Sequence, residues 1–295
     1  MTTRFPLQQV TIEGIHYGVR VAGDGPALLL LHGFTGSSRT WQPHAAPLAG
    51  TRRVIAIDAL GHGDSASPAS PDRYGVDHAV RDVLAVLDKL EAGDVTLIGY
   101  SMGGRLALHV ALAAPERVRA LVLESASPGI IQTTEREARA RDDEALAEAI
   151  EREGVDAFVA RWEALPLFAS QASLPAEARD GLRAQRRANS AVGLANSLRG
   201  MGAGTVPPVW ERLGEIRMPV LLIAGALDSK YVTIARDMAR RLPDALLDVV
   251  AHAGHAVHLE QPHDFDHTIS RFPSSEARTG VPGHAHHKRS NLSKQ

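Results

Sequence analysis

The sequence of 295 residues contains no cysteine, and this absence excludes disulfide bonds, thiolate nucleophiles and cysteine-ligated metal sites. Aromatic residues make up only 4% of the chain, and its net charge is only -2. A charge this small gives no strong overall field that would draw the protein to nucleic acid or to an acidic membrane. No apolar run reaches the roughly 18 residues that a membrane span needs, and residues 1–10 lack the apolar core of a signal peptide. We therefore expect a cytoplasmic protein that does not bind nucleic acid.

Short apolar runs that alternate with helical patterns are the main feature that the sequence does contain. Alternation of this kind is typical of a mostly parallel sheet whose strands are connected by helices. The expected buried strands are 27–31, 53–57, 95–99, 120–123, 220–224 and 246–250, with one or two antiparallel edge strands in 10–21. The expected helices are 76–90, 231–242, one after Gly103 and one after His255.

The alternating pattern is interrupted between residues 129 and 206, where the chain becomes rich in arginine, glutamate and alanine. Good helix formers without buried-strand patterns predict a helical insertion, which we expect to cover the carboxyl ends of the strands as a cap. The predicted organisation is thus a core formed by 1–128 and 207–272, a cap formed by 129–206, and a polar tail at 273–295. We expect the tail to be disordered, and its histidine cluster to be solvated and not metal-binding.

One stretch combines a strand, a sharp turn and a helix around a single serine. The apolar run that begins at Val95 ends in Gly99-Tyr100-Ser101-Met102-Gly103, and a helical pattern follows. A glycine-serine-glycine spacing at such a turn is the pattern of a nucleophile elbow, in which the serine hydroxyl is exposed above the sheet. A glycine-flanked serine also occurs in ordinary turns, but the flanking strand and helix favour a nucleophile.

A nucleophilic serine requires a base, and the base requires a carboxylate that orients it. In this strand order the partners follow as an acid and then a histidine, each after a strand. Asp228 follows the run 220–224 and His255 follows the run 246–250, so we predict a triad of Ser101, Asp228 and His255.

The remaining histidines compete for the role of base, but none has the expected position. His252 and His258 lie near His255 but not where the strand is expected to end, and His62 is expected to pack in a polar loop. His32 is expected to be structural, in a His-Gly-Phe turn. The amides of Phe34 and Met102 are the predicted oxyanion donors, and the amide of Met102 lies at a helix N-terminus.

The order of these motifs resembles that of the α/β-hydrolase superfamily over residues 10–272. The stretches that carry the resemblance are His32-Gly-Phe-Thr-Gly36, Gly61-His-Gly-Asp-Ser65, Gly99-Tyr-Ser-Met-Gly-Gly104, Gly225-Ala-Leu-Asp228 and Gly254-His255. The resemblance implies an α/β fold with an eight-stranded, mostly parallel sheet, flanking helices and a helical cap insertion.

Other stretches resemble one family of that superfamily, the 2-succinyl-6-hydroxy-2,4-cyclohexadiene-1-carboxylate synthases of menaquinone biosynthesis. They are residues 99–105, 162–168, 193–202, 228–231 and 254–260. The chain departs from the family pattern at Ala203, at Val206-Pro207 and at Ala226, which affects substrate positioning but not the reaction class. The resemblance implies a lyase without a cofactor or metal. It would expel pyruvate by 1,4-elimination from 2-succinyl-5-enolpyruvyl-6-hydroxy-3-cyclohexene-1-carboxylate, with Ser101 as the proton-abstracting base.

A substrate with several carboxylates requires fixed cations. Arg105 lies one helical turn after Ser101 on the same face, and arginine suits the bidentate capture of carboxylates. Alignment with the family adds Arg139 and Arg186 from the cap, with Arg136 as a further candidate. For all four, a solvated surface arginine is the alternative.

Two aromatic residues, Tyr100 and Trp162, are expected to line the substrate pocket, with core packing as the alternative for both. A carboxylesterase or carbon–carbon bond hydrolase with Ser101 as acyl nucleophile is the main competing function, and a non-catalytic binding protein of the same fold is another. The expected partner is a small-molecule polycarboxylate, and the expected assembly is a monomer or small homo-oligomer.

Overall fold

The central strands are formed by short runs of aliphatic residues that are buried on both faces of one sheet. In the computed structural model, which describes residues 5–272, all five residues of β3 (Ala27–Leu31) are buried. Leu28 and Leu30 pack into one hydrophobic cluster, whereas Leu29 and Leu31 pack into the cluster on the opposite face. Because successive side chains of a strand point to opposite faces, a continuous apolar run of this kind fits only the middle of a layered sheet.

The sheet has eight strands in the order β1-β2-β4-β3-β5-β6-β7-β8, in which the pairs β1–β2 and β2–β4 are antiparallel and the other five pairs are parallel. The remaining strands are β1 (Leu7–Ile12), β2 (Ile15–Ala22), β4 (Arg53–Ile57), β5 (Val95–Tyr100), β6 (Val118–Glu124), β7 (Val220–Gly225) and β8 (Ala245–Val250). The expected eight-stranded, mostly parallel sheet is therefore confirmed.

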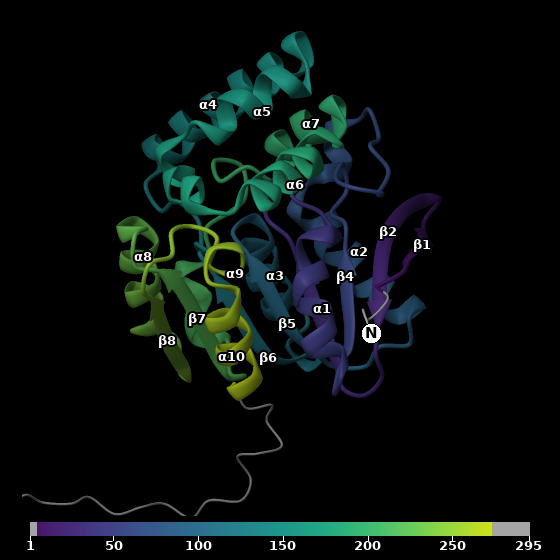
Figure 1. Cartoon of the computed structure of the whole chain (residues 1–295), viewed down its shortest axis with the longest axis vertical. Coiled ribbons are helices and arrows are strands. Elements are labelled where there is room, and N and C mark those ends of the chain that lie inside the picture. Colours follow the sequence, from purple (N-terminus) through teal and green to yellow (C-terminus); the bar gives the residue numbers. More distant parts are fainter. Residues whose placement is uncertain (1–4, 273–295) are drawn as a thin grey trace, which may run out of the picture.

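Helices cover both faces of the sheet, as Figure 1 shows. The helices α2 (Val76–Lys89), α3 (Met102–Ala113) and α8 (Ser229–Ala239) contribute apolar residues to the cluster that contains Leu29. The helices α1 (Gln42–Ala49), α9 (Val257–Glu260) and α10 (Pro262–Arg271) contribute to the cluster that contains Leu28. The sheet is thus the middle layer between two layers of helices.

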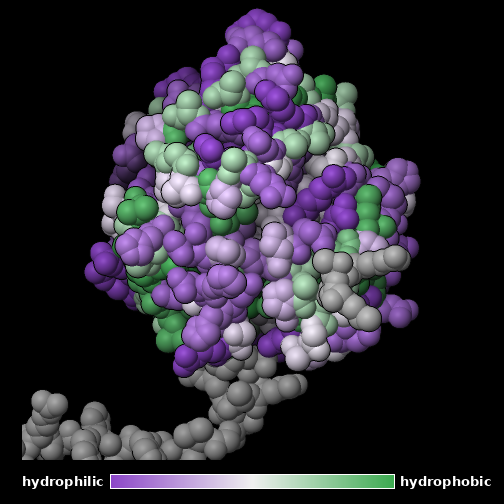
Figure 2. Space-filling view, viewed as in Figure 1, coloured by the Kyte–Doolittle hydropathy of each residue, from purple (hydrophilic) through white to green (hydrophobic). Residues whose placement is uncertain are grey.

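The chain between β6 and β7 is helical throughout its regular structure. It contains α4 (Thr133–Glu153), α5 (Val155–Glu163), α6 (Ala176–Arg187) and α7 (Ala191–Met201), which lie together above the sheet in Figure 1. We call residues 129–206 the cap. Polar residues dominate the part of its outer surface seen in Figure 2, whereas Ile150, Phe158 and Leu194 form a small core of its own.

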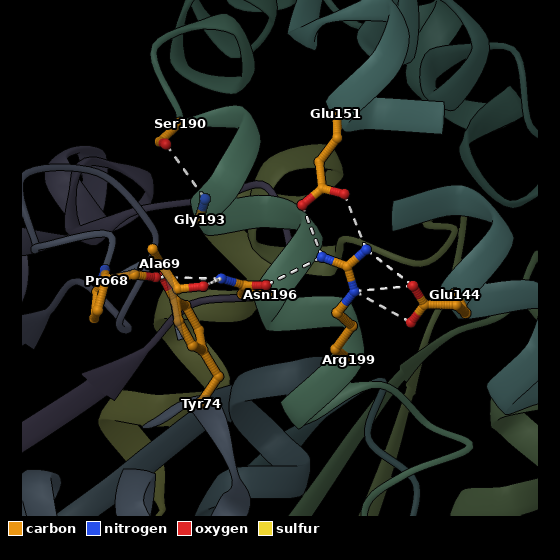
Figure 3. Close-up of polar contacts among 9 residues, drawn as sticks. All are labelled: Pro68, Ala69, Tyr74, Glu144, Glu151, Ser190, Gly193, Asn196 and Arg199. Carbon is orange, nitrogen blue, oxygen red and sulfur yellow. Dashed lines mark hydrogen bonds and ion pairs between the residues drawn. The ribbon is translucent and has the colours of Figure 1, made fainter. Parts of the chain in front are cut away.

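Helix α7 of the cap forms polar contacts with the core on one side and with α4 on the other (Figure 3). The side-chain amide of Asn196 donates to the carbonyls of Pro68 and Ala69 in the core at 3.2 and 3.0 Å. One turn later, the guanidinium of Arg199 forms ion pairs with Glu144 and Glu151 of α4 at 2.9 and 2.7 Å. The position of α7 therefore fixes the position of α4 relative to the core.

The same helix approaches the core so closely that it needs glycine at the contact. A Cβ atom on Gly193 would lie 2.3 Å from the carbonyl oxygen of Gly61, and one on Gly200 would lie 2.5 Å from the carbonyl group of Tyr74. Both clashes involve backbone atoms, which cannot move away by changing rotamer. These two glycines determine how near the cap lies to the core.

None of the helices that the structure describes is long and apolar enough to cross a membrane. The predicted disordered tail with its histidine cluster lies outside the described residues. The predicted cytoplasmic location stays a prediction.

Two glycine-to-alanine substitutions in the cap should therefore have opposite effects. Gly193→Ala should lower the free energy of unfolding by about 1–3 kcal/mol, because α7 must move away from Gly61. Gly181→Ala, in α6 with no atom within 4 Å of the added Cβ, should raise it by about 0.5–1 kcal/mol through helix propensity. Urea denaturation of both variants measures the difference, and equal effects would contradict the close contact.

Candidate active site

Ser101 lies at the sharp turn between β5 and α3 and has the strained backbone of a nucleophile elbow. Its φ is 52° and its ψ is −109°, a conformation that residues with a side chain rarely adopt. A Cβ atom on Gly103 would lie 2.3 Å from the carbonyl oxygen of Leu31, and one on Gly99 would lie 2.4 Å from that of Gly103. The glycines on both sides of Ser101 are thus required by the close approach of α3 to β3 and β5.

The structure brings together the three side chains of the predicted triad. Nε2 of His255 lies 3.0 Å from Oγ of Ser101, and Nδ1 of His255 lies 2.8 Å from Oδ2 of Asp228. With the carboxylate accepting the Nδ1 proton, Nε2 is left to accept the serine proton, which is the arrangement that activates a serine. Asp228 is also the N-cap of α8 and accepts a hydrogen bond from the amide of Tyr231.

Above Ser101 lies a cavity of about 310 Å³ between the core and the cap. Phe34 and Met102, the predicted oxyanion donors, both line it beside Ser101. Met102 is the first residue of α3, so its amide is at the positive end of the helix dipole. The cavity therefore contains Ser101 beside the N-terminus of α3.

The wall of the cavity carries an excess of positive charge. Arg105, Arg139, Arg186 and Lys230 line it, and among the described residues that line it there is no aspartate or glutamate. The structure thus places three of the four predicted arginines at the cavity. Lys230 was not predicted as a site residue, although it follows the triad aspartate by two positions.

Arg105 has no carboxylate partner in the described part of the chain. It donates one hydrogen bond to the carbonyl of Met201 at 3.2 Å, and its Nε is buried without an acceptor. Burial lowers the pKa of this guanidinium. A partly buried cation with so few partners costs free energy unless a bound anion compensates it.

Arg186 is buried and partly compensated. Its guanidinium contacts Glu163 and Gln171, both at 3.1 Å, and lies over the ring of Phe168 at 5.3 Å. Its Nε is buried without an acceptor, and burial lowers its pKa. Arg139 is more exposed and forms a single ion pair with Asp143 at 2.8 Å. One protein carboxylate therefore contacts each of these two cap arginines.

The structure does not place Arg136 in the wall of the cavity. Its guanidinium donates to the carbonyls of Ile130 and Ile131 at 3.3 and 3.2 Å, just before α4 begins. The predicted substrate contact of Arg136 is therefore not supported. Arg136 lies in the first turn of α4, where its side chain binds the backbone carbonyls that precede the helix and does not reach the cavity.

Tyr100 and Trp162 both line the cavity, as predicted for them. The ring of Tyr100 lies 5.5 Å from that of His255. The indole of Trp162 packs among Phe34 and Phe168, and its Nε1 is buried without an acceptor in the described residues.

The other histidines have structural environments. Nδ1 of His32 contacts the carbonyl of Gly33 at 2.8 Å, and its Nε2 accepts the amide of Ala59 at 3.0 Å. His258 lines the cavity, but its Nδ1 lies 2.9 Å from both carboxylate oxygens of the buried Glu124. This contact between β6 and α9 joins residues that are distant in sequence, and no local pattern could have revealed it.

No group of three or more histidine, aspartate or glutamate side chains able to hold a metal ion occurs among the described residues.

The polar lining of the cavity also includes Gln171, which comes from a short 3₁₀ segment at Pro166–Ser173. Nothing in the sequence pattern distinguishes this glutamine from a solvated one, so it could not have been predicted.

Residues 26–262 match the sequence profile described as the alpha/beta hydrolase fold, and the strand order and elbow agree with it. The chain is thus an enzyme of the α/β-hydrolase class. A Bacillus subtilis protein, provisionally named 2-succinyl-6-hydroxy-2,4-cyclohexadiene-1-carboxylate synthase, is 45% identical over 89% of this chain and 96% of its own length. Within the α/β hydrolases, the chain belongs to the 2-succinyl-6-hydroxy-2,4-cyclohexadiene-1-carboxylate synthase family.

Two further relatives support this family. The Serratia proteamaculans 2-succinyl-6-hydroxy-2,4-cyclohexadiene-1-carboxylate synthase is 32% identical over 84% of this chain and 93% of its own. The structure of MenH from S. aureus superimposes with a TM-score of 0.82 at 38% identity, over 86% of this chain and 96% of that one. An esterase from Exiguobacterium antarcticum, at 22% identity and a TM-score of 0.75, shares the fold.

A pH dependence of stability follows from His62, which is buried beside the ring of His32. Burial, and secondly the neighbouring His32, lower the pKa of His62 from 6.5 to about 3. Between these pH values the unfolded chain binds the proton and the folded chain does not. The contribution of His62 to the free energy of unfolding is therefore fully present above pH 6.5. As the pH falls below 6.5, the free energy of unfolding decreases by up to about 1.4 kcal/mol per pH unit.

Urea denaturation between pH 7 and about pH 4 measures this slope. His62→Gln removes the titrating group and should make the free energy of unfolding less dependent on pH over this range. An unchanged slope in the variant would contradict the assignment to His62.

Proposed function

We propose that the chain catalyses the 1,4-elimination of pyruvate from 2-succinyl-5-enolpyruvyl-6-hydroxy-3-cyclohexene-1-carboxylate. The product is 2-succinyl-6-hydroxy-2,4-cyclohexadiene-1-carboxylate, the compound named in its relatives. The observation that carries the proposal is the cavity wall, in which four cations stand without a single aspartate or glutamate among the described lining residues. A substrate with several carboxylates complements such a wall, whereas a neutral ester does not.

The strongest support for an anionic substrate is the set of donors that the protein itself leaves unused. Nε of Arg105, Nε of Arg186 and Nε1 of Trp162 are buried without an acceptor in the described residues, and all three residues line the cavity. Buried donors without partners are rare in folded proteins because each costs about 1–3 kcal/mol. Carboxylate oxygens of a bound substrate would provide the missing acceptors through charge-assisted hydrogen bonds.

In the proposed reaction the triad moves one proton. His255 accepts the hydroxyl proton of Ser101, and Ser101 in turn removes a proton from a ring carbon of the substrate. The electron pair of the broken C–H bond forms a new ring double bond, and the electron pair of the existing ring double bond moves one position along the ring. The C–O bond to the enolpyruvyl group breaks at the far end of this path, and its electron pair leaves with the enolate. The proton on His255 then passes to the departing enolate, which leaves as pyruvate.

Each remaining residue has a defined part in this proposal. Asp228 stabilises the imidazolium of His255 and holds its orientation. The amides of Phe34 and Met102 stabilise the oxygen on which negative charge develops during proton removal. Arg105, with Arg139 and Arg186 of the cap, binds the substrate carboxylates and so aligns the C–H bond with Ser101.

The decisive assay incubates the purified chain with the enolpyruvyl substrate and measures release of pyruvate. Ser101→Ala should reduce kcat by on the order of a thousandfold or more, because the proton-abstracting group is lost. Circular dichroism serves as the control for folding. A wild-type protein that releases no pyruvate but hydrolyses aryl esters in a Ser101-dependent reaction would support the competing hydrolase function.

Two arginine substitutions separate residues that the sequence treats alike. Arg105→Ala should cost about 2–4 kcal/mol in kcat/KM for pyruvate release, because a partly buried cation that lines the cavity is removed. Arg136→Ala should change kcat/KM by less than about 0.5 kcal/mol, because its guanidinium binds carbonyls outside the cavity wall. Steady-state kinetics of both variants provide the comparison. Equal losses would show that the charges act at long range and not by contact.

A further inference from the structure

Tyr231 lies beside the triad but has no part in the reaction as described so far. It is on the first turn of α8, three residues after Asp228, and its amide donates to Oδ1 of Asp228 at 3.2 Å. The triad carboxylate thus fixes the backbone of Tyr231. The side chain of Tyr231 consequently extends from a backbone position that is fixed relative to the triad.

The ring of Tyr231 contacts the triad histidine. The two ring centroids are 4.6 Å apart with an angle of 63° between their planes, so the rings meet edge to face. Aromatic pairs of this geometry contribute about 0.5–1.5 kcal/mol beyond the area that they bury. Tyr100 and Phe168 contact the same imidazole at 5.5 and 6.2 Å, so Tyr231 is the nearest of these three rings.

Tyr231 lines the cavity together with Arg105 and Arg139, and both guanidiniums interact electrostatically with the phenol. Among residues 5–272 its hydroxyl has no hydrogen-bond partner. Burial raises the pKa of the phenol, so the hydroxyl keeps its proton at neutral pH and can only donate to an anion.

We propose that Tyr231 is a further substrate-binding and positioning residue of this site. Its hydroxyl donates a hydrogen bond to the substrate carboxylate that Arg105 binds, and its ring fixes the plane of the His255 imidazole. The identity of that carboxylate rests on the proposed function, whereas the contact with His255 does not.

The two roles belong to different parts of one side chain, so two substitutions separate them. Tyr231→Phe keeps the ring against His255 and removes only the hydroxyl. Tyr231→Leu removes both. Tyr17→Phe is the matched control, because its hydroxyl donates to Oδ2 of Asp82 at 2.5 Å and Tyr17 does not line this cavity.

Two measurements are made on the full chain, and neither requires turnover. The first is the rate at which a neutral alkyl fluorophosphonate labels Ser101, which reports the reactivity of the triad. The second is the concentration of 1,2,4-benzenetricarboxylate that halves the labelling rate, which reports binding of carboxylates in the cavity. Release of pyruvate from the enolpyruvyl substrate is then measured for the same variants.

Tyr231→Phe should label at the wild-type rate but require roughly tenfold more tricarboxylate for half protection, with a similar rise in KM for pyruvate release. Tyr231→Leu should in addition label at least about fivefold more slowly, because the imidazole is no longer held in one plane. Tyr17→Phe should match the wild type in labelling and in protection, whatever its thermal stability.

Unchanged protection in Tyr231→Phe would overturn the role of the hydroxyl, and wild-type labelling in a folded Tyr231→Leu variant would overturn the role of the ring. If the wild type is labelled and protected as expected but releases no pyruvate, the proposed reaction fails while the assignment of Tyr231 stands. If the protection by tricarboxylate is absent in the wild type, the hydroxyl has no anion to bind and its assignment fails.

Discussion

The close approach of α3 to the ends of β3 and β5 is the constraint on which the site depends. The backbone of Gly103 packs against the carbonyls of Leu31 and His32, and Gly99 packs against Gly103 and Gly104, at distances that no Cβ atom would allow. This contact forces Ser101 into a positive φ and turns its hydroxyl out of the sheet. It also places the N-terminus of α3 beside that hydroxyl. A single packing requirement thus creates both the reactive group and its electrostatic setting.

The charges of the site are divided between two parts of the molecule. The core contributes Arg105 and Lys230, whereas the cap contributes Arg139 and Arg186. The lining residues that the structure describes include no carboxylate. The repulsion among these cations is therefore reduced only in part, by Asp143, which contacts Arg139, and by Glu163, which contacts Arg186. A polyanion bound in the cavity would reduce this repulsion further and would attract the cap and the core toward each other.

Helix α7 holds the cap in a defined position against the core. Its glycines allow backbone contact with the core, Asn196 binds core carbonyls, and Arg199 holds α4, which carries Arg139. The polar contacts in Figure 3 join α7 to the core and to α4, and so influence where Arg139 lies relative to Ser101. Small errors in that distance matter because a reacting group displaced by about 1 Å can lose a factor of about a hundred in rate.

The sequence by itself determined the layered sheet, the elbow and the order of the triad residues, because each depends on a local pattern. Buried strands appear as apolar runs, and the elbow requires glycines at fixed spacing around Ser101. Only the tertiary structure decided which charged side chains reach the cavity. Arg136 and Arg139 lie one turn apart in the same helix, but the first binds carbonyls that precede α4 and the second lines the cavity. The role of such a side chain depends on what the fold places opposite it, and that information is not contained in local sequence.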